Sequence, residues 1–327
     1  TVSAPRAQAF VTALLEATGV PVSIAREVAE ALVEADLEGA ASHGLLQLPN
    51  YIRRLRAGTI SKHDKLQPVI DRGAIAVFDA RLMLGHAGGT QAMEAAAHKA
   101  ITFGLGAVAV RNGTHFGVCG RYARQATSKG LIGIAMCNTR PMTPAPEGST
   151  PVVGNNPLAA GIPAAEGKPI VLDMAMSATA MGKIRQAMVE GRKIEPGLAL
   201  DKDGVPTEDA SAAISGMLLP AAGAKGFGLA LMIDLLSGLL SGGSMGNELA
   251  SMYGDPGQPA DCSWLMMAIE PGFFGDRAEL RERAAALARQ ISSSRTRTGA
   301  ARPQVPGHGR QERRTASAGR ITIAPTL

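Results

Sequence analysis

The first sixty residues carry apolar side chains at helical spacing. Two such stretches follow Ser3 and Ser23, and their apolar positions recur three or four residues apart. A third helix is predicted from Leu45 to Arg56, with Pro49 either in its first turn or kinking it, and Gly58 at its end. The pattern therefore predicts an N-terminal helical region over residues 1–72.

From about residue 74 the pattern changes to short apolar runs that are typical of buried strands. These runs cover residues 74–78, 107–110, 131–136, 170–172 and 265–269. Predicted helices separate several of them, at residues 91–102, 121–129, 226–240 and 277–290. The alternation predicts a layered α/β protein with a core sheet over residues 73–270, followed by a C-terminal helix and basic tail over residues 271–327.

Two irregular stretches, residues 141–163 and 182–218, are rich in glycine and proline. They are too long for plain connections between elements, so we expect them to line a site. The sequence contains no internal repeat, and its one segment of biased composition is the Arg/Ser/Gly-rich tail after Ile291.

Positive charge is concentrated near the C-terminus. The formal net charge is +5, and residues 277–320 alone hold eleven arginines and three glutamates. Aromatic residues make up only 3% of the chain, which leaves little surface on which bases could stack. We therefore expect no nucleic-acid partner, and interpret the arginines as a solvated face or as contacts to a phosphorylated cofactor.

Other patterns exclude several classes of protein. No apolar stretch reaches membrane-spanning length, and no N-terminal export signal is recognisable. Cys119, Cys137 and Cys262 lack the spacing of a disulfide framework or a zinc site, and no cluster of carboxylates and histidines has metal-ligand spacing. We expect a soluble, cytoplasmic protein that uses neither a metal nor a membrane.

A nicotinamide enzyme usually carries a GxGxxG motif between a strand and a helix, and this sequence has none. Gly104 and Gly106 precede a predicted strand, whereas Gly226 and Gly228 open a predicted helix without a third glycine. An ordinary Rossmann domain is therefore not expected. These patterns alone indicate an α/β protein with a polar site.

Eight short segments, in order along nearly the whole chain, carry more specific information. They are residues 35–44 (ADLEGAASHG), 114–117 (THFG), 132–139, 154–158 (GNNPL), 171–175 (VLDMA), 200–207 (LDKDGVPT), 219–228 (LPAAGAKGFG) and 305–307 (VPG). Together they resemble the malate/L-lactate/ureidoglycolate dehydrogenase family, which also includes diketogulonate, sulfolactate and piperideine-carboxylate oxidoreductases. The resemblance implies a non-Rossmann nicotinamide-binding fold with a mixed, largely antiparallel sheet, working as a homodimer.

The resemblance implies that NAD or NADP exchanges a hydride with the 2-carbon of a small 2-hydroxy or 2-oxo acid. It assigns proton exchange to His43, oriented by Ser42, and imidazole suits this task because its pKa lies near neutrality. His115 is the second candidate, since branches of the family emphasise different histidines. A structural hydrogen bond in a turn is the alternative for His115.

A cofactor site also follows from the resemblance. Lys225 begins a predicted helix, where a charge and free backbone N–H groups can hold a phosphate. The alternatives are a turn-capping role for Asp173, an exposed side chain for Lys225 and a mobile tail for residues 307–310. The full predicted set is His115, Phe116, Gly117, Asn138, Asp173, Met174, Ala175, Ala224, Lys225, Gly307, His308 and Arg310.

Two positions depart from the family pattern. Gln47 stands where the family usually has an arginine for the substrate carboxylate, and Asn155 stands where it usually has threonine. Arg140 occupies a position where many relatives carry a small or apolar residue, so we expect its guanidinium to have replaced the missing clamp. With Tyr51, these residues form the predicted substrate site.

Two alternatives stay open. The first is reduction of a cyclic imino acid, piperideine- or pyrroline-2-carboxylate, by the same hydride transfer. Lys183 disfavours it, because a lysine near the site would repel a protonated imine. The second is a non-catalytic nucleotide- or nucleic-acid-binding protein with a basic tail.

Overall fold

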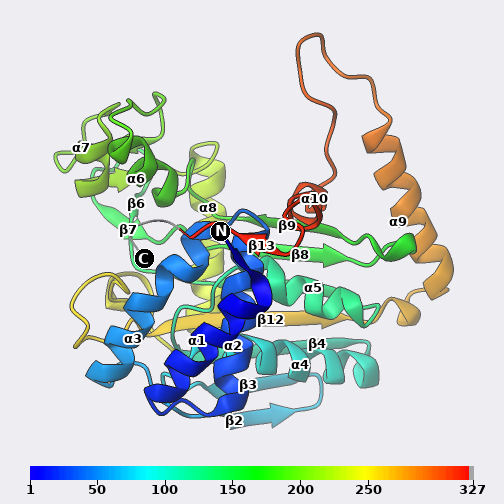
Figure 1. Ribbon diagram of the computed structural model, residues 1–327. Coiled ribbons are helices and arrows are strands. Elements are labelled where there is room, and N and C mark those ends of the chain that lie inside the picture. The colour runs from blue at the N-terminus through cyan, green and yellow to red at the C-terminus, as the bar shows by residue number, and fades with distance from the viewer. Residues whose placement is uncertain (324–327) are drawn as a thin grey trace.

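The computed structural model describes residues 1–323 and is built around one mixed sheet (Figure 1). In spatial order its strands are β2 (Gln67–Arg72), β3 (Ile75–Asp79), β4 (Leu105–Gly113), β12 (Cys262–Ile269), β5 (Ile132–Cys137), β8 (Leu158–Ile162) and β9 (Ile170–Met174). β3 and β4 run parallel, and every other pair of neighbours in this sheet is antiparallel. The predicted mixed, largely antiparallel sheet is confirmed.

Helices cover both faces of this sheet. α4 (Gly85–Phe103) and α5 (Gly120–Ser128) pack on one face, and α8 (Ala224–Asp234) packs on the other. On β12, Trp264 and Met266 face the main core, whereas Leu265 packs with Ile233 of α8. Successive side chains of a strand face opposite sides, so a strand covered on both faces has the continuous apolar run seen in the sequence. None of the helices in residues 1–323 is long and apolar enough to cross a membrane.

The N-terminal helices are α1 (Ala4–Ala17), α2 (Val22–Leu37) and α3 (Leu48–Ala57). Pro49 lies in the first turn of α3, and Gly58 ends it with a φ of 78°, a left-handed conformation that favours glycine. Two short turns, η1 (Ala41–His43) and η2 (Leu45–Gln47), connect α2 to α3. The sheet begins at Gln67, inside the region predicted as helical, because all six residues of edge strand β2 are exposed and show no apolar alternation.

Residues 181–218 form a small module with its own apolar cluster (Figure 1). It contains α6 (Met181–Val189), β10 (Ala199–Leu200), α7 (Ala210–Ser215) and β11 (Met217–Leu218). The prediction of an irregular stretch here was wrong, because helices of 9 and 6 residues are too short to show a helical repeat. The other stretch predicted as irregular holds β6 (Thr143–Pro144), β7 (Pro151–Val153) and β8.

The basic C-terminal part is folded onto the rest of the chain. α9 (Arg277–Ser292) is followed by α10 (His308–Ala316), and β13 (Arg320–Ile321) pairs with β1 (Val2–Ser3) near the N-terminus (Figure 1). The N–H of Val171 in β9 donates to the carbonyl of Pro306 at 3.0 Å. Arg313 Nε donates to the carbonyl of Glu38 at 2.8 Å. The tail is thus fastened to both β9 and α2.

Candidate active site

Two histidines and a tyrosine meet where η1, α3 and the loop after β4 come together. The ring centroids of His43 and His115 lie 5.5 Å apart, and Tyr51 Oη lies 2.6 Å from His115 Nδ1. The loop is fixed by Thr114, whose buried hydroxyl donates to the carbonyl of Met83 at 2.8 Å. The structure therefore brings together three side chains that the sequence predicted for catalysis and substrate binding.

His43 is held at one of its two ring nitrogens. Ser42 Oγ lies 2.9 Å from His43 Nδ1, which leaves Nε2 available to a ligand. Burial lowers the pKa of His43 below its usual value; the Asp173 carboxylate opposes this shift and Arg310 adds to it. The imidazole is therefore neutral at neutral pH and can accept a proton.

His115 differs from His43 in its surroundings. Burial, followed by the neighbouring His43 and His86, lowers the pKa of His115 well below its usual value. Burial raises the pKa of Tyr51 well above its usual value, so the phenol keeps its proton beside Nδ1. His115 is thus an uncharged hydrogen-bonding group.

His86 is a third histidine at this place, which the sequence analysis missed. It lies on α4, is fully buried, and sits 5.4 Å from the Tyr51 ring and 6.3 Å from the His115 ring, edge-on to both. Burial lowers the pKa of His86 to about 3. No motif surrounds it in the sequence; a histidine within an otherwise apolar and small-residue helix is the signal that could have found it.

Gln47 has a structural task in place of the missing arginine. Its buried amide nitrogen donates to the carbonyl of Ser42 at 2.6 Å and to Tyr253 Oη at 2.9 Å. Both amide hydrogens are used by the protein, so the amide group of Gln47 positions Ser42 and Tyr253. Tyr253 lies 206 residues further along the chain, and the sequence analysis missed it.

Arg140 follows β5 and is half-buried. Burial, and next the charge of Arg185, lowers the pKa of Arg140, while Tyr253 opposes the shift. Arg185, on α6, places its guanidinium carbon 4.9 Å from the ring centroid of Tyr253. Arg185 was not predicted, since an exposed arginine on a short helix has no distinguishing pattern. Lys183, two residues earlier, is exposed.

Some predicted residues face inward. Asn138 is fully buried and its amide nitrogen donates to Asp234 and to the carbonyl of Ser244, while its oxygen accepts from the N–H of Ser263. Because this amide fastens β5 to α8 and β12, we leave Asn138 out of the cofactor set proposed below.

Phe116, predicted at the cofactor, also faces the core. Its ring stacks with that of Trp264 at a centroid distance of 5.5 Å and lies tilted against that of Tyr122 at 4.9 Å, so only its backbone and that of Gly117 can line the site. Asn155, in contrast, is half-buried, and its side-chain oxygen accepts from the Thr139 hydroxyl at 2.9 Å. Its amide hydrogens remain usable by a substrate.

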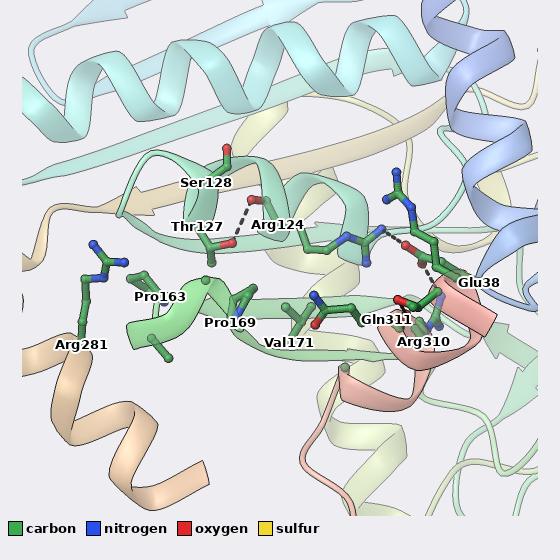
Figure 2. Close-up of a pocket in the computed structure, with 15 residues that line it drawn as sticks. Glu38, Arg124, Thr127, Ser128, Pro163, Pro169, Val171, Arg281, Arg310 and Gln311 are labelled. Carbon is green, nitrogen blue, oxygen red and sulfur yellow. Dashed lines mark hydrogen bonds and ion pairs between the residues drawn. The ribbon is translucent and has the colours of Figure 1, made fainter. Parts of the chain in front are cut away.

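Asp173 and Arg310, predicted from two separate segments of the chain, form an ion pair of 3.0 Å. Arg310 lies at one end of the cavity region of about 560 Å³ shown in Figure 2, which runs past Arg124 and Val171 to Arg281. Gly307 lines it so closely that a Cβ there would lie 3.0 Å from the carbonyl oxygen of Val171. The cavity has the size of sites that hold drug-sized ligands and is lined by arginines.

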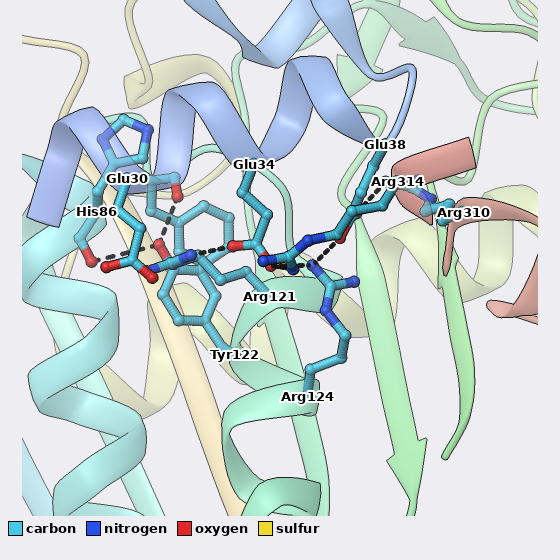
Figure 3. Close-up of polar contacts among 10 residues, drawn as sticks. Glu30, Glu34, Glu38, His86, Arg121, Tyr122, Arg124, Arg310 and Arg314 are labelled. Carbon is cyan, nitrogen blue, oxygen red and sulfur yellow. Dashed lines mark hydrogen bonds and ion pairs between the residues drawn. The ribbon is translucent and has the colours of Figure 1, made fainter. Parts of the chain in front are cut away.

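An ion-pair network forms the wall of this cavity (Figure 3). Glu34 pairs with Arg121, with Arg124 at 3.3 Å and with Arg314 at 3.0 Å. Burial would raise the pKa of Glu34, but these arginines outweigh it and hold the pKa below its usual value. Part of the basic tail therefore neutralises buried acids of α2, which the interpretation as a solvated basic face did not anticipate.

The remaining cofactor candidates are spread over three places. Met174 and Ala175 end β9, and the N–H of Ala221 donates to the carbonyl of Met176 at 2.8 Å, which ties this end to the start of α8. Ala224 and Lys225 are exposed in the first turn of α8. His308 lines a separate hollow between α9 and the β8–β9 connection.

Comparison with known proteins places this geometry in context. The family model for malate/L-lactate dehydrogenase matches residues 2–327. The L-sulfolactate dehydrogenase of Methanocaldococcus jannaschii is 38% identical over 281 residues, which cover 86% of this chain and 81% of that protein. The (2R)-3-sulfolactate dehydrogenase (NADP(+)) of Chromohalobacter salexigens is 37% identical over 276 residues, covering 84% and 82%.

Solved structures agree with the fold. The sulfolactate dehydrogenase from Methanocaldococcus jannaschii superposes with a TM-score of 0.94 at 34% identity, over 99% of this chain and 93% of that chain. The delta1-piperideine-2-carboxylate reductase from Pseudomonas syringae pvar. tomato superposes with a TM-score of 0.90 at 29% identity, over 100% and 97%.

Proposed function

This chain belongs to the malate/L-lactate dehydrogenase family, and from that membership we propose how its residues work as a nicotinamide-dependent oxidoreductase of 2-hydroxy acids. The carrying observation is His43, which is neutral, held by Ser42 at 2.9 Å and placed with its ring centroid 5.5 Å from that of His115. His43 exchanges a proton with the 2-oxygen of the acid.

The residues present fit a nicotinamide dinucleotide, NAD or NADP. Arg310 Nη1 and Glu38 Oε2 are buried at the cavity and make no hydrogen bond among the described residues, while Asp173 Oδ2 is held by its ion pair with Arg310 Nη2. A free donor and a free acceptor suit a ribose–phosphate segment, which offers both hydroxyl groups and anionic oxygens. We assign that segment to Asp173, Arg310 and Gly307, with the backbone at Gly117, Met174 and Ala175 toward the nicotinamide and Ala224 and Lys225 beyond it.

A bound nicotinamide would supply the hydride donor or acceptor for the 2-carbon of the acid. In the oxidative direction, Nε2 of neutral His43 accepts the proton of the 2-hydroxyl group. The Nδ1–H of His43 then donates to Ser42 Oγ, which keeps the ring oriented while it is charged. His115 remains neutral and can hydrogen-bond the same oxygen, while Arg140 and Asn155 hold the carboxylate.

A panel of acids tests this proposal. Pyruvate, oxaloacetate, sulfopyruvate and two cyclic imino acids should be assayed with NADH and with NADPH, following loss of the reduced nicotinamide absorbance. We expect at least one oxo acid to be reduced with a higher kcat/KM than either imine. A far faster reduction of piperideine- or pyrroline-2-carboxylate would replace this function with the second candidate, which the likeness to the piperideine-carboxylate reductase favours.

The pH dependence of the oxidative reaction follows from His43. Because burial lowers its pKa below the usual 6.5, protonation should inactivate the base only at more acidic pH. We expect kcat/KM for hydroxy-acid oxidation to be flat near neutrality and to fall as the pH drops through the lowered pKa. Rate profiles of the wild type and His43→Asn check this; an acidic limb above pH 6.5, or one that persists in the variant, contradicts it.

We further propose that the protein works as a homodimer through α8 and the turn that follows. Leu229, Met232, Leu236 and Leu239 are all at least 40% exposed and recur at helical spacing, which makes an apolar stripe without a cover. We expect Met232→Glu to shift the sedimentation coefficient from dimer to monomer. Phe10→Glu, at a phenylalanine of α1 that is 64% exposed against 48% for Met232, is the control and should leave the dimer intact. A wild-type monomer at micromolar concentration contradicts the proposal.

We also propose a reducing compartment, the cytoplasm, as predicted. Cys119, Cys137 and Cys262 are free and buried, and burial raises the pKa of the first two thiols well above their usual value. Thiols of this kind are inert core side chains that suit a reducing environment.

A further inference from the structure

Two side chains hold the turn that carries His43. η1 and η2 contain only three residues each, and hydrogen bonds in such short turns are poorly aligned. The amide of Gln47 holds the turn before His43, at the carbonyl of Ser42. Asp36, near the end of α2, holds it after His43, since the N–H of Leu45 donates to Asp36 Oδ2 at 3.0 Å. His43 therefore lies between two points at which side chains fasten the backbone.

The carboxylate of Asp36 also packs directly on Gly44, the residue after His43. A Cβ on Gly44 would lie 2.6 Å from Asp36 Oδ2 and nearer still to Oδ1, closer than a real side chain can come. The φ of Gly44 is −93°, which other residues can adopt, so the close approach of the carboxylate is what requires glycine here. α2 and the turn are thus in contact at this position.

Asp36 differs from the neighbouring acids of α2. Glu34 and Glu38 both pair with Arg124. Asp36 forms no ion pair within residues 1–323, and the N–H of Leu45 is the one donor there from which its carboxylate accepts. Burial raises the pKa of Asp36 to about 6, while the hydrogen bond from Leu45 opposes the shift. Since no cation compensates this burial, the interaction that the carboxylate gains is its hold on the turn.

We infer that Asp36 is a positioning residue for proton exchange, because its carboxylate anchors the η1–η2 turn to α2 and so fixes the place of His43. The inference rests on the proposed function and adds a residue to it. The role uses the backbone of the turn, since the charged groups that shift the pKa of His43 lie elsewhere, at Asp173 and Arg310. A reacting group that is displaced by about 1 Å can lose about 10²-fold in rate. The anchor is therefore expected to act on kcat.

The test compares Asp36→Ala with Asp36→Asn in single-turnover reduction of the oxo acid that the wild type uses best. We expect Asp36→Ala to lower the rate of hydride transfer by about 10- to 100-fold and to leave the Kd of the reduced nicotinamide within about threefold. Asparagine keeps an oxygen that can accept the N–H of Leu45, so Asp36→Asn should recover most of the loss. It should stay below the wild type, because a neutral acceptor forms the weaker hydrogen bond.

Asp276→Ala is the matched control. Asp276 accepts the N–H of Glu279 at 2.9 Å at the start of α9, so this variant also loses a hydrogen bond between a carboxylate and the backbone. We expect its rate of hydride transfer to equal that of the wild type.

Gly44→Ala tests the same contact from the other side. Its methyl group would meet the Asp36 carboxylate, so this variant should displace the turn and lose rate. In the double variant Asp36→Ala/Gly44→Ala the space is free, and the rate should fall by less than the product of the two single losses. A double loss that equals this product contradicts the direct contact.

Hydrogen–deuterium exchange of residues 41–47 provides a readout that does not depend on turnover. Exchange in this segment should be faster in Asp36→Ala than in the wild type and in Asp36→Asn. Equal exchange in all three, equal losses of rate in the two variants, or a wild-type rate in Asp36→Ala overturns the inference and leaves the proposed function standing. A wild type that reduces none of the acids overturns the proposed function, and the exchange then still decides whether Asp36 anchors the turn.

Discussion

Replacing His43 by alanine should lower kcat by about 10²- to 10⁴-fold, the usual contribution of a positioned acid–base group. The affinity for reduced nicotinamide should change little, because the groups assigned to the cofactor's ribose–phosphate segment are Asp173, Arg310 and Gly307. Single-turnover rates and fluorescence titration of the reduced cofactor measure the two quantities separately.

His115→Asn and His98→Asn complete this experiment. His115 is neutral and tied to Tyr51, so its loss should cost less than that of His43 while perturbing substrate binding. His98 is exposed on α4 and pairs with Glu94, which makes it the surface control. If the His115 variant lost most of its turnover while the His43 variant kept nearly all of it, the roles assigned to the two histidines would be reversed.

The sheet was predictable from the sequence because its strands are covered on both faces. The runs at residues 107–110 and 265–269 became β4 and β12, whose alternate side chains enter two different cores. The strand β2 was missed for the opposite reason, since its exposed residues carry no pattern. Short helices such as α7 were missed because one or two turns hold too few positions for a period.

The site was predictable where a motif is local and hidden where it depends on tertiary contacts. Ser42 and His43 are adjacent in sequence, and their hydrogen bond follows from the motif. Tyr253 reaches Gln47 across 206 residues, and Arg314 reaches Glu34 across 280, so no spacing along the chain could indicate either contact. The direction of a side chain was equally hidden: the THFG motif contains both His115, which faces the site, and Phe116, which faces the core.

Arg140→Ala should lower kcat/KM for every acid substrate. The loss should correspond to about 2–5 kcal/mol of transition-state stabilisation, the cost of removing one partner from a desolvated charge pair. The expectation rests on the half-buried position of Arg140 in the loop after β5 and on Gln47 standing where a clamp would otherwise be. Steady-state kinetics with pyruvate and oxaloacetate measure it, and the loss should be similar for both because each carries the 1-carboxylate.

Gln47→Ala is the variant with which the loss in Arg140→Ala should be compared. Gln47 holds Ser42 and Tyr253 through two hydrogen bonds, so its removal should cost about 1–3 kcal/mol, less than the loss of Arg140. Equal and small losses for Gln47→Ala and Arg140→Ala would contradict the assignment of Arg140 to the substrate site. Deleting a guanidinium that binds the substrate carboxylate should cost more than deleting a neutral hydrogen bond.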